Sequence, residues 1–146
     1  LAAGGSNAQV EKPFKLGPNE QKLLDLTNAE RKKEDLPPLK ANALLFQAAR
    51  GHSHNMAKQG KLEHDLDEKT PFDRMKDTGY RFSRAGENIA YGTDNLGQAD
   101  IMKIWMGSEG HKANILNADF TEIGLGIARN DKGEVYYTQV FGAPLK

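Results

Sequence analysis

Residues 122–141 read EIGLGIARNDKGEVYYTQVF, and this stretch decides the fold. Ile123, Leu125 and Ile127 alternate with other residues, which is the two-residue period of a β-strand with one apolar face. The NDKG at 130–133 is typical of a turn, and a run rich in β-branched and aromatic residues follows it. The stretch therefore predicts a β-hairpin. The glycines between its apolar residues indicate that a helix or another backbone packs closely against the first strand.

Four helical patterns precede the hairpin. The first begins at Pro18 and ends before Pro37, because a residue that precedes proline avoids the α region. The second follows Asn42 and ends at Gly60, a residue type that readily adopts the left-handed conformation of a helix end. The third begins at Thr70, which serves as its cap, with proline in the first helical position and a capping-box acid after it.

The fourth helix is expected over about 96–109. Its predicted inner face carries Ile101, Ile104, Trp105 and Ser108. A short strand is expected near 89–91. Helices followed by a hairpin indicate one mixed α and β domain over 18–146, preceded by a tail or tether over 1–17 that lacks apolar periodicity.

The composition excludes several classes of function. Basic and acidic residues number 20 each, so the net charge is zero and the basic excess of a nucleic-acid-binding protein is lacking. The basic run 31–33 is flanked by Glu30 and Glu34, which predicts a solvated helix face with pairs of mixed sign. The chain holds no cysteine, which rules out disulfides, thiolate nucleophiles and sulfur-rich zinc sites.

Two features bear on the compartment. No apolar run approaches the roughly 18 residues that a membrane-spanning helix needs. The small, featureless residues 1–6 fit either the remnant of a cleaved export signal or residues left from cloning, and further domains before Leu1 are left open.

Three separated residues are candidates for chemistry. His64 lies in a polar loop after the second helix, and loops carry function more often than helix interiors do. Glu87 lies between a glycine and an asparagine, where its carboxylate either satisfies the N–H groups of a turn or serves a site. His111 is expected just past a helix end at Gly110, where the helix dipole favours a cationic imidazole. Spacing alone leaves open whether the three residues meet.

Other polar residues receive simpler interpretations. His52 is expected to be a buried core histidine held by one or two hydrogen bonds, and His54 to be exposed. Ser108 and His111 are three residues apart across the expected helix end, so a nucleophile pair is conceivable, but no oxyanion hole can be recognised in the sequence.

A series of motifs runs in order along 23–142. They are LTNAER at 26–31, LPPL at 36–39, AARGHS at 48–53, His64, PFDR at 71–74, GENIA at 86–90, Trp105, Ser108, GHKANIL at 110–116, FTEIG at 120–124 and YTQVFG at 137–142. In this order they resemble the bacterial branch of the CAP superfamily, also called SCP-like, which includes the cysteine-rich secretory proteins. No single motif is strong, but the ordered set leaves little room for chance.

The resemblance implies an α+β fold, a three-layer α-β-α sandwich with a central cleft. In many members two histidines and two glutamates meet in that cleft, and the histidines can hold a divalent metal, often zinc. By motif these residues are His64, His111 and Glu87, while Ser108 stands at the position of the second glutamate. The neighbouring Glu109 is left open, because it points about 100° away on a helix.

The resemblance thus implies a metal site and a candidate catalytic set. His64 and His111 would ligate Zn²⁺ or another divalent metal weakly, with Glu87 as a third ligand or behind one histidine. The catalytic candidates are Glu87, His64, His111 and Ser108, and if the protein is an enzyme it would be a metal-dependent hydrolase.

The expected function is that of a secreted or cell-envelope protein, extracellular or periplasmic. It would act as a monomer that binds a small molecule, lipid, peptide or cell-wall component, and no nucleic acid. The alternatives are a metal-assisted hydrolase of peptides or cell-wall polymers and a structural envelope protein. Binding is preferred because two imidazoles, one carboxylate and a serine without an oxyanion hole are chemically incomplete for hydrolysis.

Overall fold

The computed structural model describes residues 14–146, and a four-stranded sheet forms its middle layer. In spatial order its strands are β1 (Lys40–Ala41), β3 (Glu122–Arg129), β4 (Glu134–Pro144) and β2 (Phe82–Thr93). The predicted hairpin is confirmed, since β3 and β4 pair in antiparallel fashion across the turn at 130–133. Strand β2 is much longer than the predicted 89–91 and lies at the edge of the sheet, whereas the short β1, parallel to β3, was not predicted.

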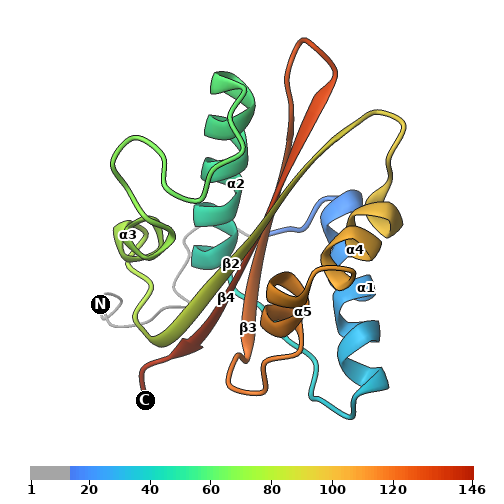
Figure 1. The fold of residues 1–146 in the computed structure, drawn as a ribbon. Helices are drawn as coiled ribbons and strands as arrows, with labels where there is room; N and C mark the ends of the chain where they lie inside the picture. The colour runs from blue at the N-terminus through green and yellow to red at the C-terminus, as the bar shows by residue number, and fades with distance from the viewer. Residues whose placement is uncertain (1–13) are drawn as a thin grey trace.

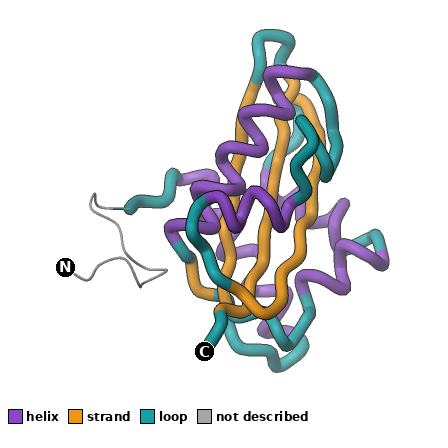
Figure 2. Tube along the Cα trace, turned by 90° about the vertical axis from the view of Figure 1, so that its left-hand side faces the viewer, coloured by secondary structure: helices purple, strands orange, loops and turns teal. Residues whose placement is uncertain are grey.

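Helices cover both faces of this sheet, which makes the three-layer α-β-α sandwich (Figure 1). One face carries α2 (Ala43–Gln59) and α3 (Pro71–Asp77). The other face carries α1 (Pro18–Lys33), α4 (Gln98–Met106) and α5 (Glu109–Ile115). Figure 2 views the molecule from the side of α2 and α3, with the strands behind these helices. The expected fold class is therefore confirmed.

Two glycines of β3 let helix α2 pack directly on the sheet. A Cβ atom on Gly124 would lie 2.1 Å from the backbone carbon of Leu45, and one on Gly126 would lie 2.2 Å from the Ala49 carbonyl oxygen. Both distances are far shorter than any van der Waals contact. The predicted close packing of a helix on this strand is therefore confirmed.

The helix ends follow the capping chemistry of the sequence. The Asn42 side chain accepts hydrogen bonds from the first turn of α2, and Gly60 closes that helix with a φ of 66°. Thr70 and Asp73 form the capping box that begins α3. These local signals set the ends of the two helices between which His64 lies.

The expected fourth helix is in fact two helices. Helix α4 ends at Met106, and Ser108 is the N-cap residue of α5 rather than part of the inner face of α4. The prediction that Gly110 ends a helix was wrong, because Gly110 lies in the first turn of α5. Ile104 was also placed wrongly, since its side chain is exposed, while Ile101 and Trp105 are fully buried as expected.

The basic run 31–33 is only partly a solvated face. Lys32 and Lys33 are exposed, but Arg31 is almost completely buried. Its guanidinium donates to the carbonyl oxygens of Pro37, Ile115, Asn117 and Phe120. Arg31 therefore joins α1 to the chain around the end of α5, and the prediction of a solvated residue was wrong for it.

The start of the described chain packs against the domain. Phe14 and Leu16 pack against the core, and the Phe14 ring lies 5.0 Å from the ring of Phe46 on α2 and 5.5 Å from the Arg50 guanidinium. The rest of the expected tail, residues 1–13, lies outside the described residues. Among residues 14–146, none of the helices is both long and apolar enough to cross a membrane.

Candidate functional site

A hydrogen-bonded group of His64, Glu87 and Arg74 lies between α3 and the edge strand β2. Nδ1 of His64 is 2.9 Å from Oε1 of Glu87. Arg74 donates from Nη2 to both carboxylate oxygens of Glu87, at 3.3 and 3.0 Å. The Glu87 side chain is only 2% exposed, whereas that of His64 is 50% exposed. Glu87 is therefore a buried support, and the His64 imidazole is the part that faces solvent.

The partner of His64 determines which ring nitrogen is available. An ionised carboxylate can only accept hydrogen bonds, so Nδ1 of His64 carries a proton and donates it to Glu87. In the neutral ring Nε2 is then the unprotonated nitrogen. The hydrogen bond to Glu87 raises the pKa of His64 above its ordinary value, although partial burial acts in the opposite direction.

Arg74 also fixes the loop that carries His64. Its Nη2 donates to the His64 carbonyl oxygen at 2.7 Å, and its Nη1 donates to the Lys69 carbonyl oxygen at 3.1 Å. One guanidinium thus ties both ends of the 64–69 loop to the carboxylate of β2. Because the planar fork of arginine directs several N–H groups at fixed angles, lysine could not make all of these contacts.

His111 approaches the same strand from the opposite layer. Asn88, the residue after Glu87 on β2, donates from Nδ2 to the His111 carbonyl oxygen at 3.0 Å. Burial, and then the charge of nearby His64, lower the pKa of His111. Its Nδ1 is buried and has no hydrogen-bond partner among residues 14–146. His64 and His111 thus lie beside neighbouring residues of β2, one on the side of each helical layer.

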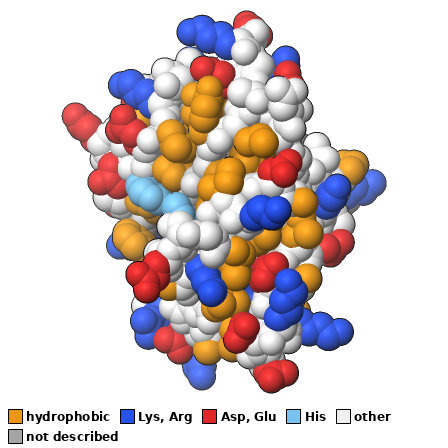
Figure 3. Space-filling model, turned by 45° about the vertical axis from the view of Figure 1, so that its right-hand side comes forward, with side chains coloured by type: hydrophobic (Ala, Val, Ile, Leu, Met, Phe, Trp, Pro, Cys, Tyr) orange, Lys and Arg blue, Asp and Glu red, His pale blue; other side chains and the backbone are white. Residues whose placement is uncertain are grey.

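The expected environment of His111 was wrong. Because α5 begins at Glu109, His111 lies in the first turn of a helix and not just past a helix end. The N-terminal end of a helix dipole disfavours a cation, which agrees with the direction of the pKa shift. Figure 3 shows histidine side chains gathered at one place on this face of the molecule, with hydrophobic side chains beside them.

A chain of hydrogen-bonded amides, buried except at its Asn114 end, holds β2 and α5 in this arrangement. Asn114 donates to the Asn88 side chain at 2.9 Å, and Asn88 donates to the Gln139 side chain at 2.9 Å. Gln139 in turn donates to the Thr27 hydroxyl of α1 at 2.9 Å. Buried amides with all partners in place specify one geometry, because each unpaired polar atom would cost free energy.

The other two candidates from the sequence, Ser108 and Glu109, are close to His111 in the chain but make no hydrogen bond to the site residues within the described chain. Ser108 is partly buried, but its hydroxyl makes no hydrogen bond to His111 or to the helix it caps, within the described chain. Glu109 is exposed at the start of α5 and is not hydrogen-bonded to His64, Glu87 or Arg74. The nucleophile pair considered from the spacing therefore has no hydrogen bond in this structure.

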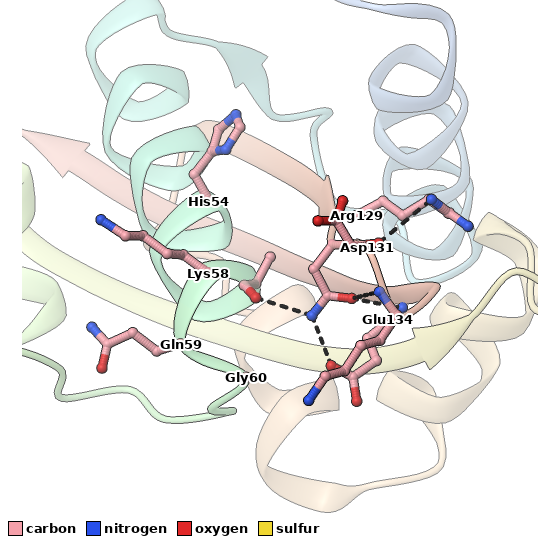
Figure 4. Close-up of a pocket in the computed structure, with 10 residues that line it drawn as sticks. His54, Lys58, Gln59, Gly60, Arg129, Asp131 and Glu134 are labelled. Carbon is pink, nitrogen blue, oxygen red and sulfur yellow. Dashed lines mark hydrogen bonds between the residues drawn. The ribbon is translucent and has the colours of Figure 1, made fainter.

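The two histidines of α2 match their predictions. His52 is buried, with Nε2 2.8 Å from the Glu63 carbonyl oxygen, so it donates to the residue that precedes His64. Burial lowers the pKa of His52. His54 is exposed. It lines a separate hollow of about 470 Å³ between the end of α2 and the β3–β4 hairpin (Figure 4).

That hollow lacks a convergent set of groups. In Figure 4 the Lys58 side chain points away from Arg129 and Asp131. The Asn130 amide is already used, since Nδ2 donates to the Ala57 carbonyl oxygen and to the Glu134 side chain. The hollow shares no residue with the site around β2.

Metal-binding capacity is limited by the number of available donors. No three His, Asp or Glu side chains in the described part of the chain are grouped so that they could hold one ion. The Glu87 oxygens are hydrogen-bonded to His64 and Arg74. The donors that remain available to a metal ion are therefore imidazole nitrogens. Nδ1 of His111, which has no hydrogen-bond partner in the described chain, is one such nitrogen.

Arg74 is the member of the site that residue spacing missed. It belongs to the PFDR motif, which contributes to the family resemblance and to the start of a helix but assigns no partner to the arginine. A buried carboxylate on a strand needs a cationic or donating partner, so Glu87 was the signal that one existed. Nothing in the sequence said which of the chain's 20 basic residues it was.

Comparisons with known proteins agree with this architecture. A model of the cysteine-rich secretory protein family, CAP, matches residues 24–141. YkwD of Bacillus subtilis (strain 168) is 38% identical over 138 residues, or 94% of this chain. The chain spans about half the length of that relative, 52%.

Solved structures show the same fold. An extracellular protein containing an SCP domain from Bacillus anthracis str. Ames has a TM-score of 0.75 and 31% identity, over 89% of this chain and 45% of that one. An outer surface protein from Borrelia burgdorferi has a TM-score of 0.82 and 20% identity, over 90% and 97% of the two chains. NaASP2, solved with Zn²⁺, has a TM-score of 0.61 and 16% identity, over 84% and 78%.

Proposed function

Because the chain belongs to the cysteine-rich secretory protein (CAP) family, we propose that it is a secreted bacterial binding module. Its site is formed by His64, Glu87 and His111, and its ligand is a small extracellular molecule, lipid, peptide or cell-wall component. Secretion is part of the proposal and is supported by the extracellular relative of Bacillus anthracis. The chain spans about half the length of YkwD, 52%, so the proposal concerns the function of this domain. Extending that function to a longer protein that contains the domain is part of the same proposal.

The observation that carries this proposal is the unpartnered Nδ1 of His111 together with its place near a second imidazole, that of His64; Nδ1 of the core residue His52 is also unpartnered, so the lack of a partner alone would not suffice. A buried polar atom without a partner costs free energy, so such atoms are uncommon unless a ligand or water completes them. Nε2 of His64 is the second available nitrogen nearby, on a half-exposed ring. His64, which is held by the buried Glu87 carboxylate and through it by Arg74, and His111 would together supply the few polar anchors that a small-ligand site requires.

Hydrolysis is less well supported than binding. A general base needs a free lone pair directed at a water or substrate, and both oxygens of Glu87 already accept from Arg74 or His64. A serine nucleophile needs a base within hydrogen-bond reach, and Ser108 has no hydrogen bond to His111. The metal-assisted hydrolase and the structural envelope protein thus remain the alternatives that an experiment must exclude.

A divalent ion is the first ligand to test. Borderline ions such as Zn²⁺ accept imidazole nitrogen, and the lowered pKa of His111 keeps that ring neutral and able to ligate. His64 and His111 would hold the ion, with Glu87 orienting His64 from behind. When bound, such an ion supplies a Lewis acid that attracts an oxygen of the ligand. With only two protein nitrogens the affinity would be low.

Thermal unfolding with and without Zn²⁺ tests this arrangement. Zinc at about 100 times its dissociation constant should add about 2.7 kcal/mol of stability. His64→Ala and His111→Ala should each remove most of this gain, whereas His54→Ala, an exposed histidine on α2, should retain it. An identical response of all four proteins would contradict the site.

A turnover screen separates binding from catalysis. Peptides, peptidoglycan fragments and esters would be incubated with the zinc-treated protein, and we expect no turnover that depends on the site. Activity that Glu87→Gln abolishes and His54→Ala retains would replace the binding proposal with a hydrolase. Ligand-dependent stabilisation by any of these compounds, without turnover, would instead exclude a purely structural role.

A further inference from the structure

The outer edge of β2 exposes backbone groups beside the two site histidines. β2 has 12 residues and forms one edge of the sheet, whereas β1 at the other edge has only two. A long edge strand presents a row of N–H and C=O groups with which another chain can pair. Lysine and proline commonly protect such an edge, and neither occurs in Phe82–Thr93.

The strand register shows which residues of β2 face outward. The carbonyl oxygens of Thr121 and Ile123 accept hydrogen bonds from β1 and the residue after it, so the even-numbered residues of β3 face β4. The even-numbered residues of β4 then face β3, and its odd-numbered residues face β2. Their partners on β2 are the even-numbered residues. Glu87, Ile89 and Tyr91 therefore direct their N–H and C=O groups away from the sheet.

Side chains of α4 and α5 occupy two of these outward carbonyl groups. Trp105 donates to the Ile89 carbonyl oxygen at 3.0 Å, and Asn114 donates to that of Glu87 at 3.3 Å. Both contacts agree with the outward direction that the register gives. The N–H groups of Glu87, Ile89 and Tyr91 have no acceptor among residues 14–146. This part of the edge therefore presents mainly hydrogen-bond donors.

The donor edge runs beside both site histidines. On the side of α3, the Glu87 carboxylate holds the His64 ring. On the side of α5, Asn88 donates to the His111 carbonyl oxygen. A ligand that lies along residues 87–91 would therefore pass near both imidazoles.

We propose that this edge binds an extended peptide as an added β-strand. The inference rests on the proposed function, because it selects the peptide among the ligands named there. Residues i and i+2 of a strand are about 6.6 Å apart, so the N–H groups of Ile89 and Tyr91 match alternate carbonyl groups of an extended peptide. The two oxygens of one carboxylate share a carbon atom and cannot reach both donors.

The edge can also accept hydrogen bonds from such a peptide. A carbonyl oxygen has two lone pairs, so that of Ile89 can accept a peptide N–H in addition to Trp105. The Tyr91 carbonyl oxygen has no partner within the described chain. The Tyr91 ring is 42% exposed and lies 5.2 Å from that of Tyr136, so it offers an apolar contact to the peptide side chain opposite it.

A second copy of the chain fits this edge less well than a peptide. Trp105 and Asn114 reach the edge from one helical layer, and the loop of His64 flanks it on the other. A whole domain would meet these elements before its own edge strand reached β2. A single peptide needs only the width of one strand, about 4.8 Å.

Amide hydrogen exchange on the whole chain tests the proposal. The probe is selected from a phage-displayed library of random peptides of about nine residues, an ordinary strand length. The selected peptide should slow exchange at Ile89 and Tyr91. Methylation of alternate peptide nitrogens should weaken binding by about tenfold in one register and little in the other, because only alternate N–H groups face β2. Selection of no peptide, or unchanged exchange at both amides, would overturn the proposal.

Proline variants assign the binding to the backbone of the edge. Tyr91→Pro removes an outward N–H and no bond of the sheet, so it should fold and bind about tenfold more weakly. Tyr91→Ala keeps the N–H and should lose less, and Ile104→Ala, exposed on α4, should bind like wild type. Ala90→Pro removes a bond to β4 and should be far less stable in denaturant. Equal binding by Tyr91→Pro and wild type, or equal losses in both Tyr91 variants, would overturn the proposal.

The zinc response separates this inference from the proposed function. Stabilisation by zinc that depends on His64 and His111, in a protein that selects no peptide, would overturn strand addition and leave the histidine site in place. Peptide binding that slows exchange at the edge, without any zinc response and unchanged in both histidine variants, would support the edge and overturn the histidine site. A dimer in sedimentation velocity that Tyr91→Pro dissociates, without peptide binding, would assign the edge to self-association and overturn the inference.

Discussion

Glu87 accepts hydrogen bonds from His64 and Arg74 although its side chain is almost completely buried. A buried carboxylate is tolerated when it is paired, and it becomes strongly destabilising when its partner is removed. Most of the Arg74 side chain is also buried, so water cannot replace it readily. The stability of the fold therefore depends on the Arg74–Glu87 ion pair, and so does the position of His64.

Arg74→Gln should therefore destabilise the protein by about 3 kcal/mol, at the lower end of the range for a broken buried pair. Denaturant unfolding at neutral pH measures this. The matched control is Arg84→Gln, which breaks an exposed pair with Asp119 and should cost no more than about 1 kcal/mol. Equal effects of the two changes would mean that the Arg74–Glu87 pair does not support the fold.

The two site histidines should have opposite effects on stability as pH changes. The raised pKa of His64 gives stability that is fully present below its unfolded pKa of about 6.5 and is lost as pH rises through the folded pKa. The lowered pKa of His111 means that protonation favours the unfolded chain, so this residue reduces stability as pH falls below about 6.5.

Denaturant unfolding in metal-free buffer from about pH 5 to 9 can separate these effects. His64→Asn should lose most stability, relative to wild type, at the acidic end. His111→Asn should instead be more stable, relative to wild type, at that acidic end than at the basic end. Parallel stability profiles of the two variants would contradict the pKa directions and hence the arrangement of the two rings.

At the scale of secondary structure elements, the contact between α2 and β3 is closest where glycines lie. Gly124→Ala would place a methyl group into the backbone of Leu45, so the whole helix would have to move. We expect a loss of about 3 kcal/mol, the upper part of the range for overpacking. Gly51→Ala is the control: it lies within α2, meets no atom within 4 Å, and should stabilise the helix by about 0.5–1 kcal/mol.

Trp105 joins α4 to the edge strand. Its ring is fully buried, and its Nε1 donates to the Ile89 carbonyl oxygen at 3.0 Å. Trp105→Ala should cost about 3–5 kcal/mol in denaturant unfolding, as for other large aromatic residues of a core. The neighbouring Ile104→Ala, on the exposed face, should change stability by about 0.5 kcal/mol or less. A small effect of Trp105→Ala would mean that α4 contributes little to the core.

Prediction from the sequence worked best where a local signal acts alone. The hairpin, the start of α3 and the end of α2 each follow from residues that contact one another within a turn or two. The break between α4 and α5 did not follow, because glycine after Ser108 and Glu109 reads equally well as a helix end or as the first turn of a new helix. Tertiary packing resolved that ambiguity, and it also changed the expected charge state of His111.

At the scale of the whole molecule, long-range polar contacts were the least predictable part. Arg31 reads as one cation in a charged run, yet it reaches carbonyl groups more than 80 residues away in the sequence. Arg74 pairs with Glu87 across two elements for which the sequence gives no register. The ordered motifs named the family and its histidines, but residue types and spacing could not identify the partners that hold them.

The core itself should make folding independent of metal. A chain of 146 residues buries about 70% of the surface that its unfolded form exposes, and apolar side chains are buried on both faces of the sheet. We therefore expect cooperative thermal unfolding, followed by circular dichroism, to persist with excess chelator. Zinc should then raise the midpoint modestly at about pH 7.5, and this gain should disappear below about pH 6, because protonated imidazole cannot ligate. Loss of the cooperative transition in chelator would show that a metal holds the layers together, which a fold with a complete apolar core does not require.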